Sequence, residues 1–201
     1  YEEYPARYST DVTRRYRWIR GDWQIARWVF PRVPGPDGRT RSNPLSALSR
    51  WKLFDNLRRS LVPAALTSLF VVGWTLLSPA WLWTLATLAL FLIAPVLATV
   101  VDLCRKPEDM RMSQHVTATV RAMGRQLTHV LLTLMCLPYE SFYSLGAIVR
   151  TAARMWFTRT GLLEWNASGA ADTSRTDLLG SYRSMWIGPA MALIITIILV
   201  Q

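Results

Sequence analysis

Cysteine, histidine and lysine are scarce in this sequence. Only two cysteines occur among 201 residues, Cys104 and Cys136, and they give neither a disulfide framework nor the spacing of metal ligands. The two histidines, His115 and His129, have no carboxylate partner in the pattern, which favours structural roles over metal binding. A glycine-rich phosphate loop, paired carboxylates at helical spacing and a Ser/His/Asp order are also missing. The chain therefore contains no recognisable catalytic acid or base.

Arginine and apolar residues dominate what is present. The net charge is +10, although 51% of the residues are hydrophobic and the mean hydropathy is +0.17. Residues 1–60 contain 13 of the 23 basic residues against six acids, which leaves a local net charge of +7. Only Lys52 and Lys106 are lysines, a bias that a GC-rich genome would also produce without any function. The separation of charge from apolar sequence indicates a membrane protein with a basic face.

Two uncharged stretches follow the basic block, at residues 61–77 and 79–101. As helices they would be about 26 and 35 Å long, enough to cross a hydrocarbon core of roughly 30 Å. Ser78 and Pro79 separate them, so we expect a transmembrane helical hairpin over residues 61–101. Three tryptophans lie near the turn, as in the aromatic belt at a membrane surface: Trp74, Trp81 and Trp83.

Residues 34–60 are expected to form a loop and then an interfacial helix. The proline- and glycine-rich residues 31–44 predict a loop without regular structure. Asn43 followed by Pro44 is typical of a helix start. The helix that follows mixes apolar and basic side chains, which favours a membrane-surface helix over the core helix of a soluble protein.

The second half of the chain is harder to divide. Residues 102–126 carry five basic residues and are expected to form a cytoplasmic loop. Residues 127–149 are apolar, but Glu140 lies near their middle, where a bilayer would penalise a carboxylate by about 2.5–3.5 kcal/mol. Five more arginines follow, so an even number of crossings is expected, with residues 127–185 forming interfacial or re-entrant helices. Residues 186–201 are expected to start a further transmembrane helix.

The basic block contains an unusual aromatic cluster at residues 14–28, with five arginines, three tryptophans and one acid. Arginine offers planar charged forks that suit diphosphate oxygens, and tryptophan offers a flat apolar face on which a pyranose ring can stack. A site that binds a nucleotide-sugar diphosphate beside the end of a glycan needs both groups. Two R/Q-x-x-R-W patterns occur here: Arg14, Arg17 and Trp18, and then Gln24, Arg27 and Trp28.

The block "RYRWIRGDWQ" resembles the RxRWxRGxxQ block of cellulose-synthase-like processive glycosyltransferases. Longer strings, from "RRYRWIRGDWQIARW" through "NPLSALSRWK" and "LPYESFYSLGAIVRT" to "LLGSYRSMW", resemble cyclic β-1,2-glucan synthase. The resemblance covers nearly the whole chain. It implies that residues 1–33 are the C-terminal end of an α/β glycosyltransferase domain. The expected fold class is therefore an all-α membrane region, with transmembrane and interfacial helices, attached to the helical end of that domain.

The resemblance also implies an activity and a location. Such a protein polymerises UDP-glucose into a growing glucan at the cytoplasmic side of the bacterial inner membrane. The chain's partners would be these substrates, the lipid bilayer and further domains of a longer polypeptide, of which it would be a piece. The catalytic aspartates and the divalent metal of the parent enzyme, Mg or Mn, would lie upstream of residue 1, so no cofactor is expected to bind this segment and it should be inactive alone.

The resemblance implies a substrate-binding set within the block: Arg14, Arg17, Trp18, Arg20, Gly21 and Gln24. Arg17 would face the UDP diphosphate and Trp18 the acceptor glucose. Arg14 stands where the family has glutamine. The second pattern, ending in Arg27 and Trp28, is the alternative, and the first is preferred because Arg20, Gly21 and Gln24 then match the block.

A different class of function is also compatible with the residues. Arginine and tryptophan ahead of a membrane helix can bind the interface through anionic lipids, so a non-catalytic anchor, scaffold or transporter segment is the alternative. Nucleic-acid binding is not expected, because the basic stretch leads directly into lipid.

Overall fold

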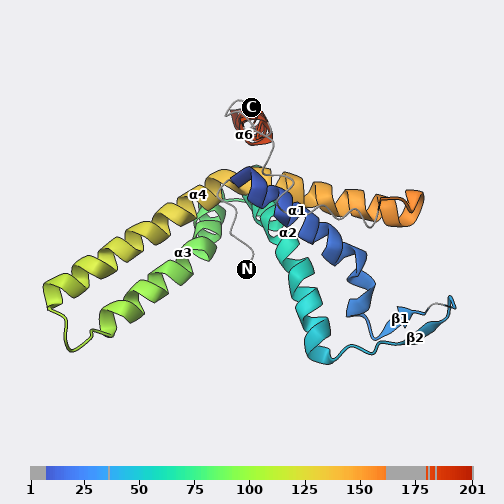
Figure 1. The fold of residues 1–201 in the computed structure, drawn as a ribbon. Helices are drawn as coiled ribbons and strands as arrows, with labels where there is room; N and C mark the ends of the chain where they lie inside the picture. The colour runs from blue at the N-terminus through green and yellow to red at the C-terminus, as the bar shows by residue number, and fades with distance from the viewer. Residues whose placement is uncertain (1–7, 36, 162–179, 181, 184, 201) are drawn as a thin grey trace. The chain divides into compact units, whose positions relative to one another are not determined.

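The computed structural model describes residues 8–35, 37–161, 180, 182–183 and 185–200 (Figure 1). The chain divides into two compact units, one built from Tyr1–Ala64 and Tyr139–Ile187 and the other from Ala65–Pro138 and Gly188–Gln201. Residues 1–7 of the expected glycosyltransferase end lie outside the described residues, as does most of 162–185 in the expected interfacial segment. Each unit is described separately below.

The first unit contains the arginine- and tryptophan-rich block. Its elements, in chain order, are α1 (Tyr8–Gln24), η1 (Ala26–Val29), β1 (Arg32–Pro34), β2 (Thr40–Ser42), the beginning of α2 (Ala47–Thr75), the end of α4 (Met112–Ala153) and the π-helical turn η2 (Arg154–Thr158).

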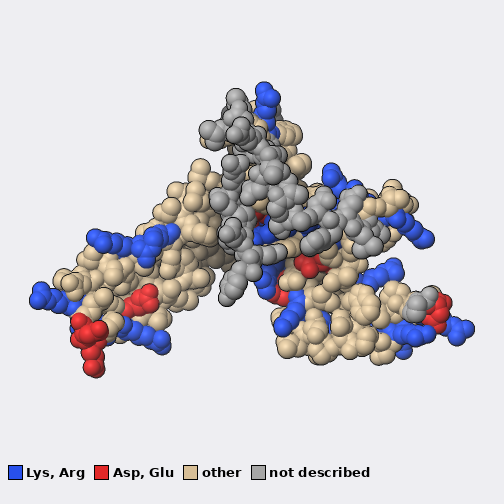
Figure 2. Space-filling view, in the orientation of Figure 1, with Lys and Arg blue, Asp and Glu red and all other residues tan. Residues whose placement is uncertain are grey.

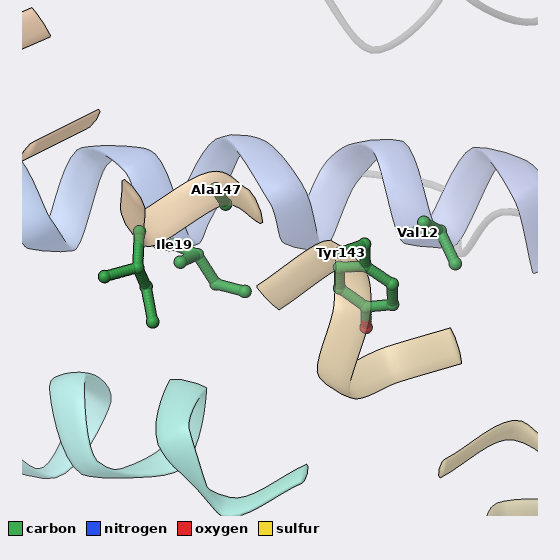
Figure 3. Packing of buried hydrophobic residues seen from close by; sticks show 5 residues of the cluster. Val12, Ile19, Tyr143 and Ala147 are labelled. Carbon is green, nitrogen blue, oxygen red and sulfur yellow. The ribbon is translucent and has the colours of Figure 1, made fainter. Parts of the chain in front are cut away.

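The core of this unit is a seam between α1 and α4. On α1 the side chains at positions 12, 16, 19 and 23 repeat with helical spacing and therefore share one face. Val12 and Ile19 are buried there against Tyr143, Ala147 and Ile148 of α4, as Figure 3 shows in close view. Ala147 is fully buried, at 0% exposure, so its methyl group sets how closely the two helices approach.

Hydrogen bonds tie the beginning of α2 to both helices of the seam. The Trp23 indole of α1 donates to the hydroxyl of Ser60, at 2.9 Å. The Ser141 hydroxyl of α4 donates to the carbonyl of Pro63, at 2.6 Å. The three helices of this unit are therefore joined by polar contacts in addition to apolar packing.

The expectation that residues 31–44 lack regular structure is wrong. Strands β1 and β2 pair as a short antiparallel hairpin, with Arg32 opposite Ser42. Gly38 adopts a left-handed backbone (φ 74°), which lets the chain reverse between the strands. Pro34 lies at the end of its strand, where the lack of an N–H costs little.

The second unit contains the helical hairpin that the two apolar stretches predict. The end of α2 is followed by the Ser78-Pro79 turn and by α3 (Ala80–Cys104). The Trp74 indole donates to the Thr84 hydroxyl across the turn, at 2.8 Å. Gly73 faces the Trp83 side chain so closely that a Cβ would lie 2.8 Å from it, so a larger residue would push the helices apart.

The first part of α4 and helix α6 (Ile187–Val200) complete this unit. Thr99 of α3 lies against Met123 of α4, with its hydroxyl 3.1 Å from the sulfur. Residues 102–111 connect α3 to α4. In Figure 2 charged side chains gather toward this end of the two helices, and the rest of their visible surface is mainly uncharged.

Two of the described helices are long and apolar enough to cross a membrane, Ala80–Cys104 and the helical stretch Met112–Thr158. The predicted all-α membrane region is therefore confirmed, with β1 and β2 as its short exceptions among the described residues. Helix α2 contains most of the expected span 61–77 and ends at Thr75. It is not among these two, because Arg58 and Arg59 directly precede its apolar part.

The helices extend across the expected segment boundaries at residues 60, 101 and 126. The chain does not separate an interfacial helix from a span at residue 60, because α2 continues through Ser60 and Pro63. Residues 102–126 are mostly helical rather than a loop, since α3 extends to Cys104 and α4 begins at Met112. Charged side chains occur near these boundaries, but they do not interrupt the hydrogen bonding of the helices.

Residues 127–149 lie within one helix, and their interfacial or re-entrant placement stays a prediction. Helix α4 continues through Pro138 without a break. Leucine and methionine before this proline are strong helix formers, and one proline removes only one backbone donor.

The tight contact at Ala147 gives a test of the seam. Ala147→Phe should destabilise the first unit by about 1–3 kcal/mol, because a fully buried methyl site has no room for a ring. The measurement is the apparent melting temperature of the detergent-purified protein. Val149→Phe, two residues away and 64% exposed, is the matched control and should leave this temperature unchanged. Equal losses from both variants would contradict the α1–α4 packing.

Candidate functional site

Helix α1 presents two chemically different faces. The face at positions 12, 16, 19 and 23 packs in the first unit. The opposite face of the helix holds five of the six residues expected to bind substrate: Arg14, Arg17, Trp18, Gly21 and Gln24. With 3.6 residues per turn these five lie along one stripe of the helix. The residues expected to touch substrate are therefore not used in the apolar seam.

Arg14 and Trp18 form a stacked pair on this outward stripe. The Arg14 guanidinium lies 4.7 Å from the centre of the Trp18 ring, and it also donates to Asp11 at 2.9 Å. Trp18 remains 54% exposed despite this contact. An indole held from one side and largely exposed is suited to stacking on a flat partner.

Arg17 and Gly21 occupy the same stripe beside the indole. Arg17 is half-buried and lies one position from Trp18. Among the described residues, nothing lies within 4 Å of the position that a Cβ at Gly21 would take. A guanidinium and an indole are thus adjacent on the helix, one turn from this glycine.

Arg20 is placed differently from the other predicted residues. Its guanidinium donates to the carbonyl of Gly161, at 2.9 Å, and Arg154 donates to the same oxygen at 2.8 Å. Arg20 therefore helps to connect α1 to the chain just after η2. Sequence spacing places it in the motif, but the structure gives it a contact within the protein.

Most of the alternative pattern lies outside helix α1, in a different secondary structure. Gln24 ends α1, and Arg27 and Trp28 lie in the 3-10 turn η1. The Asn43 side chain donates to the carbonyl of Trp28, at 2.7 Å, which ties this turn to the start of α2. The two patterns therefore do not share one regular helical surface: the first lies wholly within α1, and the second continues from its last residue into η1.

Sequence reasoning missed an ion-pair cluster centred on Arg15. Its guanidinium pairs with Asp11 of its own helix and with Glu140 of α4, both at 2.9 Å. The Tyr8 hydroxyl donates to the same Glu140 oxygen, at 3.2 Å. The Asp11–Arg15 spacing of four residues is a visible sequence signal, but nothing in the sequence links either residue to a carboxylate 125 positions away.

The cluster keeps Arg15 charged. Burial disfavours its charge, but attraction to Tyr143 and Glu140, with the hydrogen bond to Glu140, raises the pKa of Arg15 above its ordinary value. The guanidinium also lies 5.6 Å from the centre of the Tyr143 ring. The carboxylate that appeared costly at mid-bilayer is thus matched by a permanent cation from another helix.

No group of three or more His, Cys, Asp or Glu residues that could hold a metal ion occurs within the described part of the chain. Placement of the metal and the catalytic aspartates upstream of residue 1 stays a prediction.

Comparison with known proteins tests the resemblance. No family model matches the chain. Over 196 residues, or 96% of its length, the chain is 31% identical to a protein described as cyclic beta-(1,2)-glucan synthase NdvB from Rhizobium meliloti (strain 1021). The predicted resemblance is confirmed. The chain spans only 7% of the length of this relative, so the similarity concerns one small part of it.

The two faces of α1 predict losses of stability of different size for two tryptophans five residues apart. Trp23→Ala should destabilise the protein by about 2 kcal/mol, since it removes packing on the seam side and the hydrogen bond to Ser60. Trp18→Ala should cost less than about 1 kcal/mol, because the exposed indole loses mainly its contact with Arg14. Thermal unfolding of both variants checks this. A larger loss of stability for Trp18→Ala than for Trp23→Ala would contradict the assignment of the packed face of α1.

Proposed function

We propose that this chain is part of a membrane-embedded glucosyltransferase that polymerises UDP-glucose into cyclic β-1,2-glucan. The outward stripe of α1 binds the diphosphate and the glucan end, and the apolar helices anchor it in the bacterial inner membrane. The observation that carries this proposal is the 31% identity with a cyclic glucan synthase over 96% of the chain. The adjacency of Arg17 and an exposed Trp18 on one stripe supports the assignment of the site to α1.

The chemistry of the stripe fits the two ligands. Arg17 offers a charged fork to diphosphate oxygens, and Trp18 offers an apolar surface to the C–H face of a glucose ring. Because the two residues are consecutive, a donor diphosphate and an acceptor sugar would be held side by side. The chain itself would contribute binding and orientation. Aspartates outside it would hold the divalent metal, Mg or Mn, and remove the acceptor proton.

A second role, binding to the membrane surface, is favoured by the beginning of α2. Leu48, Trp51 and Phe54 are 63%, 61% and 43% exposed, and the two aromatic rings stack with centroids 5.6 Å apart. Lys52 is exposed beside them. Aromatic and basic side chains in this arrangement suit a lipid headgroup layer. A non-catalytic anchor would use this surface and leave α1 without a ligand.

The site predicts that Arg17 and Trp18 fail in different ways. In the complete synthase, Arg17→Ala should weaken UDP binding roughly ten- to a hundredfold, because a charge-assisted contact contributes about 1.5–3 kcal/mol. Trp18→Ala should leave UDP affinity nearly unchanged but abolish chain elongation, since the acceptor is no longer held in attack geometry. The measurements are UDP affinity and glucan yield per amount of folded protein.

Arg27→Ala and Trp28→Ala are the matched controls, because they change the same residue types in the alternative pattern. They should affect UDP affinity and elongation much less. If they reproduce the two effects, the second pattern is the site. If all four variants lower only membrane insertion or protein yield, the anchor role is correct and the sugar site is not on α1.

The contact between α1 and α4 also predicts a topology. Residues 1–60 and the end of α4 should lie on the same side of the membrane, since Arg15 of α1 contacts Glu140. The excess of basic residues in 1–60 predicts that this is the cytoplasmic side. A single cysteine at Ser78, in the exposed turn of the hairpin, should react with a membrane-impermeant maleimide added outside spheroplasts. One at Val149, which is 64% exposed on α4, should react only after the membrane is permeabilised. External labelling at Val149 would mean that α4 crosses the membrane once before this residue.

A further inference from the structure

We propose that Arg15 and Glu140 are positioning residues that fix α1 on α4 and thereby orient the indole of Trp18. Resting on the proposed function, this assigns a role in elongation to two residues outside the motif. Neither residue belongs to the outward stripe. Their effect on the reaction would pass through other side chains.

A continuous chain of contacts joins Glu140 to Trp18. Glu140 accepts from Arg15 at 2.9 Å, and Arg15 forms an ion pair with Asp11 at 2.9 Å. The other oxygen of Asp11 accepts from Arg14, again at 2.9 Å. The Arg14 guanidinium then lies 4.7 Å from the centre of the Trp18 ring. Two hydrogen bonds, one ion pair and one cation–π contact therefore connect the position of α4 to the indole.

The ion pair can fix the register of the two helices, which the apolar seam alone does poorly. The buried side chains of the seam are few, and aliphatic contacts can re-form after a shift of one turn, about 5.4 Å. Glu140 is the only acidic residue in the 42 residues of α4, so Arg15 has one possible partner along that helix. A single buried polar pair is a known device for specifying helix register.

The Arg15–Glu140 pair is partly shielded from water, which strengthens the ion pair. The side chains of Arg15 and Glu140 are 31% and 15% exposed. Aromatic rings flank the guanidinium, with Tyr8 at 5.7 Å and Tyr143 at 5.6 Å from its central carbon. In such a half-buried setting a carboxylate and a guanidinium interact more strongly than at an open surface.

The test compares Glu140→Gln, Arg15→Gln and the double variant in the complete synthase. Each single variant should lower kcat for glucan synthesis about tenfold or more, with the KM for UDP-glucose changed less than threefold, because attack geometry is more sensitive to misplacement than binding is. The double variant should lose no more than either single one, since both remove the same pair. Hydrogen–deuterium exchange of the α1 amides should rise in all three.

Asp55→Asn is the matched control. Asp55 also accepts from two arginines, Arg58 and Arg59, but all three residues lie on α2. This variant should leave kcat, KM and α1 exchange unchanged.

Three outcomes would overturn the inference. If Glu140→Gln leaves kcat unchanged while Trp18→Ala abolishes elongation, the site is on α1 but does not need the pair. If kcat and KM change together with the amount of folded protein, the pair only stabilises the fold. If α1 exchange rises but Trp18→Ala has no effect on elongation, the pair fixes α1 and the proposed function itself fails.

Discussion

The contact between α1 and α4 is the constraint on which the rest of the first unit depends. Apolar side chains of both helices bury each other around Ala147, and Arg15 brings a permanent positive charge to the acid Glu140. These contacts determine which face of α1 is covered. The opposite face, with Arg17 and Trp18, takes no part in this seam. The contacts with α4 therefore fix the rotation of α1 about its own axis.

Much of this arrangement could be predicted from the sequence. The uncharged residues 79–101 must be helical if they are in lipid, because only a helix pairs every backbone group within the segment. Ser78 and Pro79 indicate the turn of the hairpin, and the structure contains it. The motif residues at positions 14, 17, 18, 21 and 24 already share a stripe by helical geometry.

Other features depend on tertiary contacts that no local pattern contains. Glu140 was the reason to expect an interrupted or interfacial segment, because an unpaired carboxylate in lipid is costly. The structure provides its partner, Arg15, from 125 positions earlier in the chain. Arg20 likewise matches the motif by spacing, but donates to the carbonyl of Gly161. The helices also continue through charged residues near positions 60, 102 and 121, because charge alone does not interrupt helical hydrogen bonding.

The central claim is that the stripe of α1 containing Arg17 and Trp18 binds the diphosphate of the donor beside the end of the glucan. The most direct measurement is photo-crosslinking of the complete synthase in membranes, with a UDP-glucose analogue that carries a photoreactive group on the sugar. We predict that labelling falls on residues 14–24 and is abolished by excess UDP. Labelling restricted to the turn with Arg27 and Trp28, or labelling of α1 that UDP does not displace, would contradict this claim.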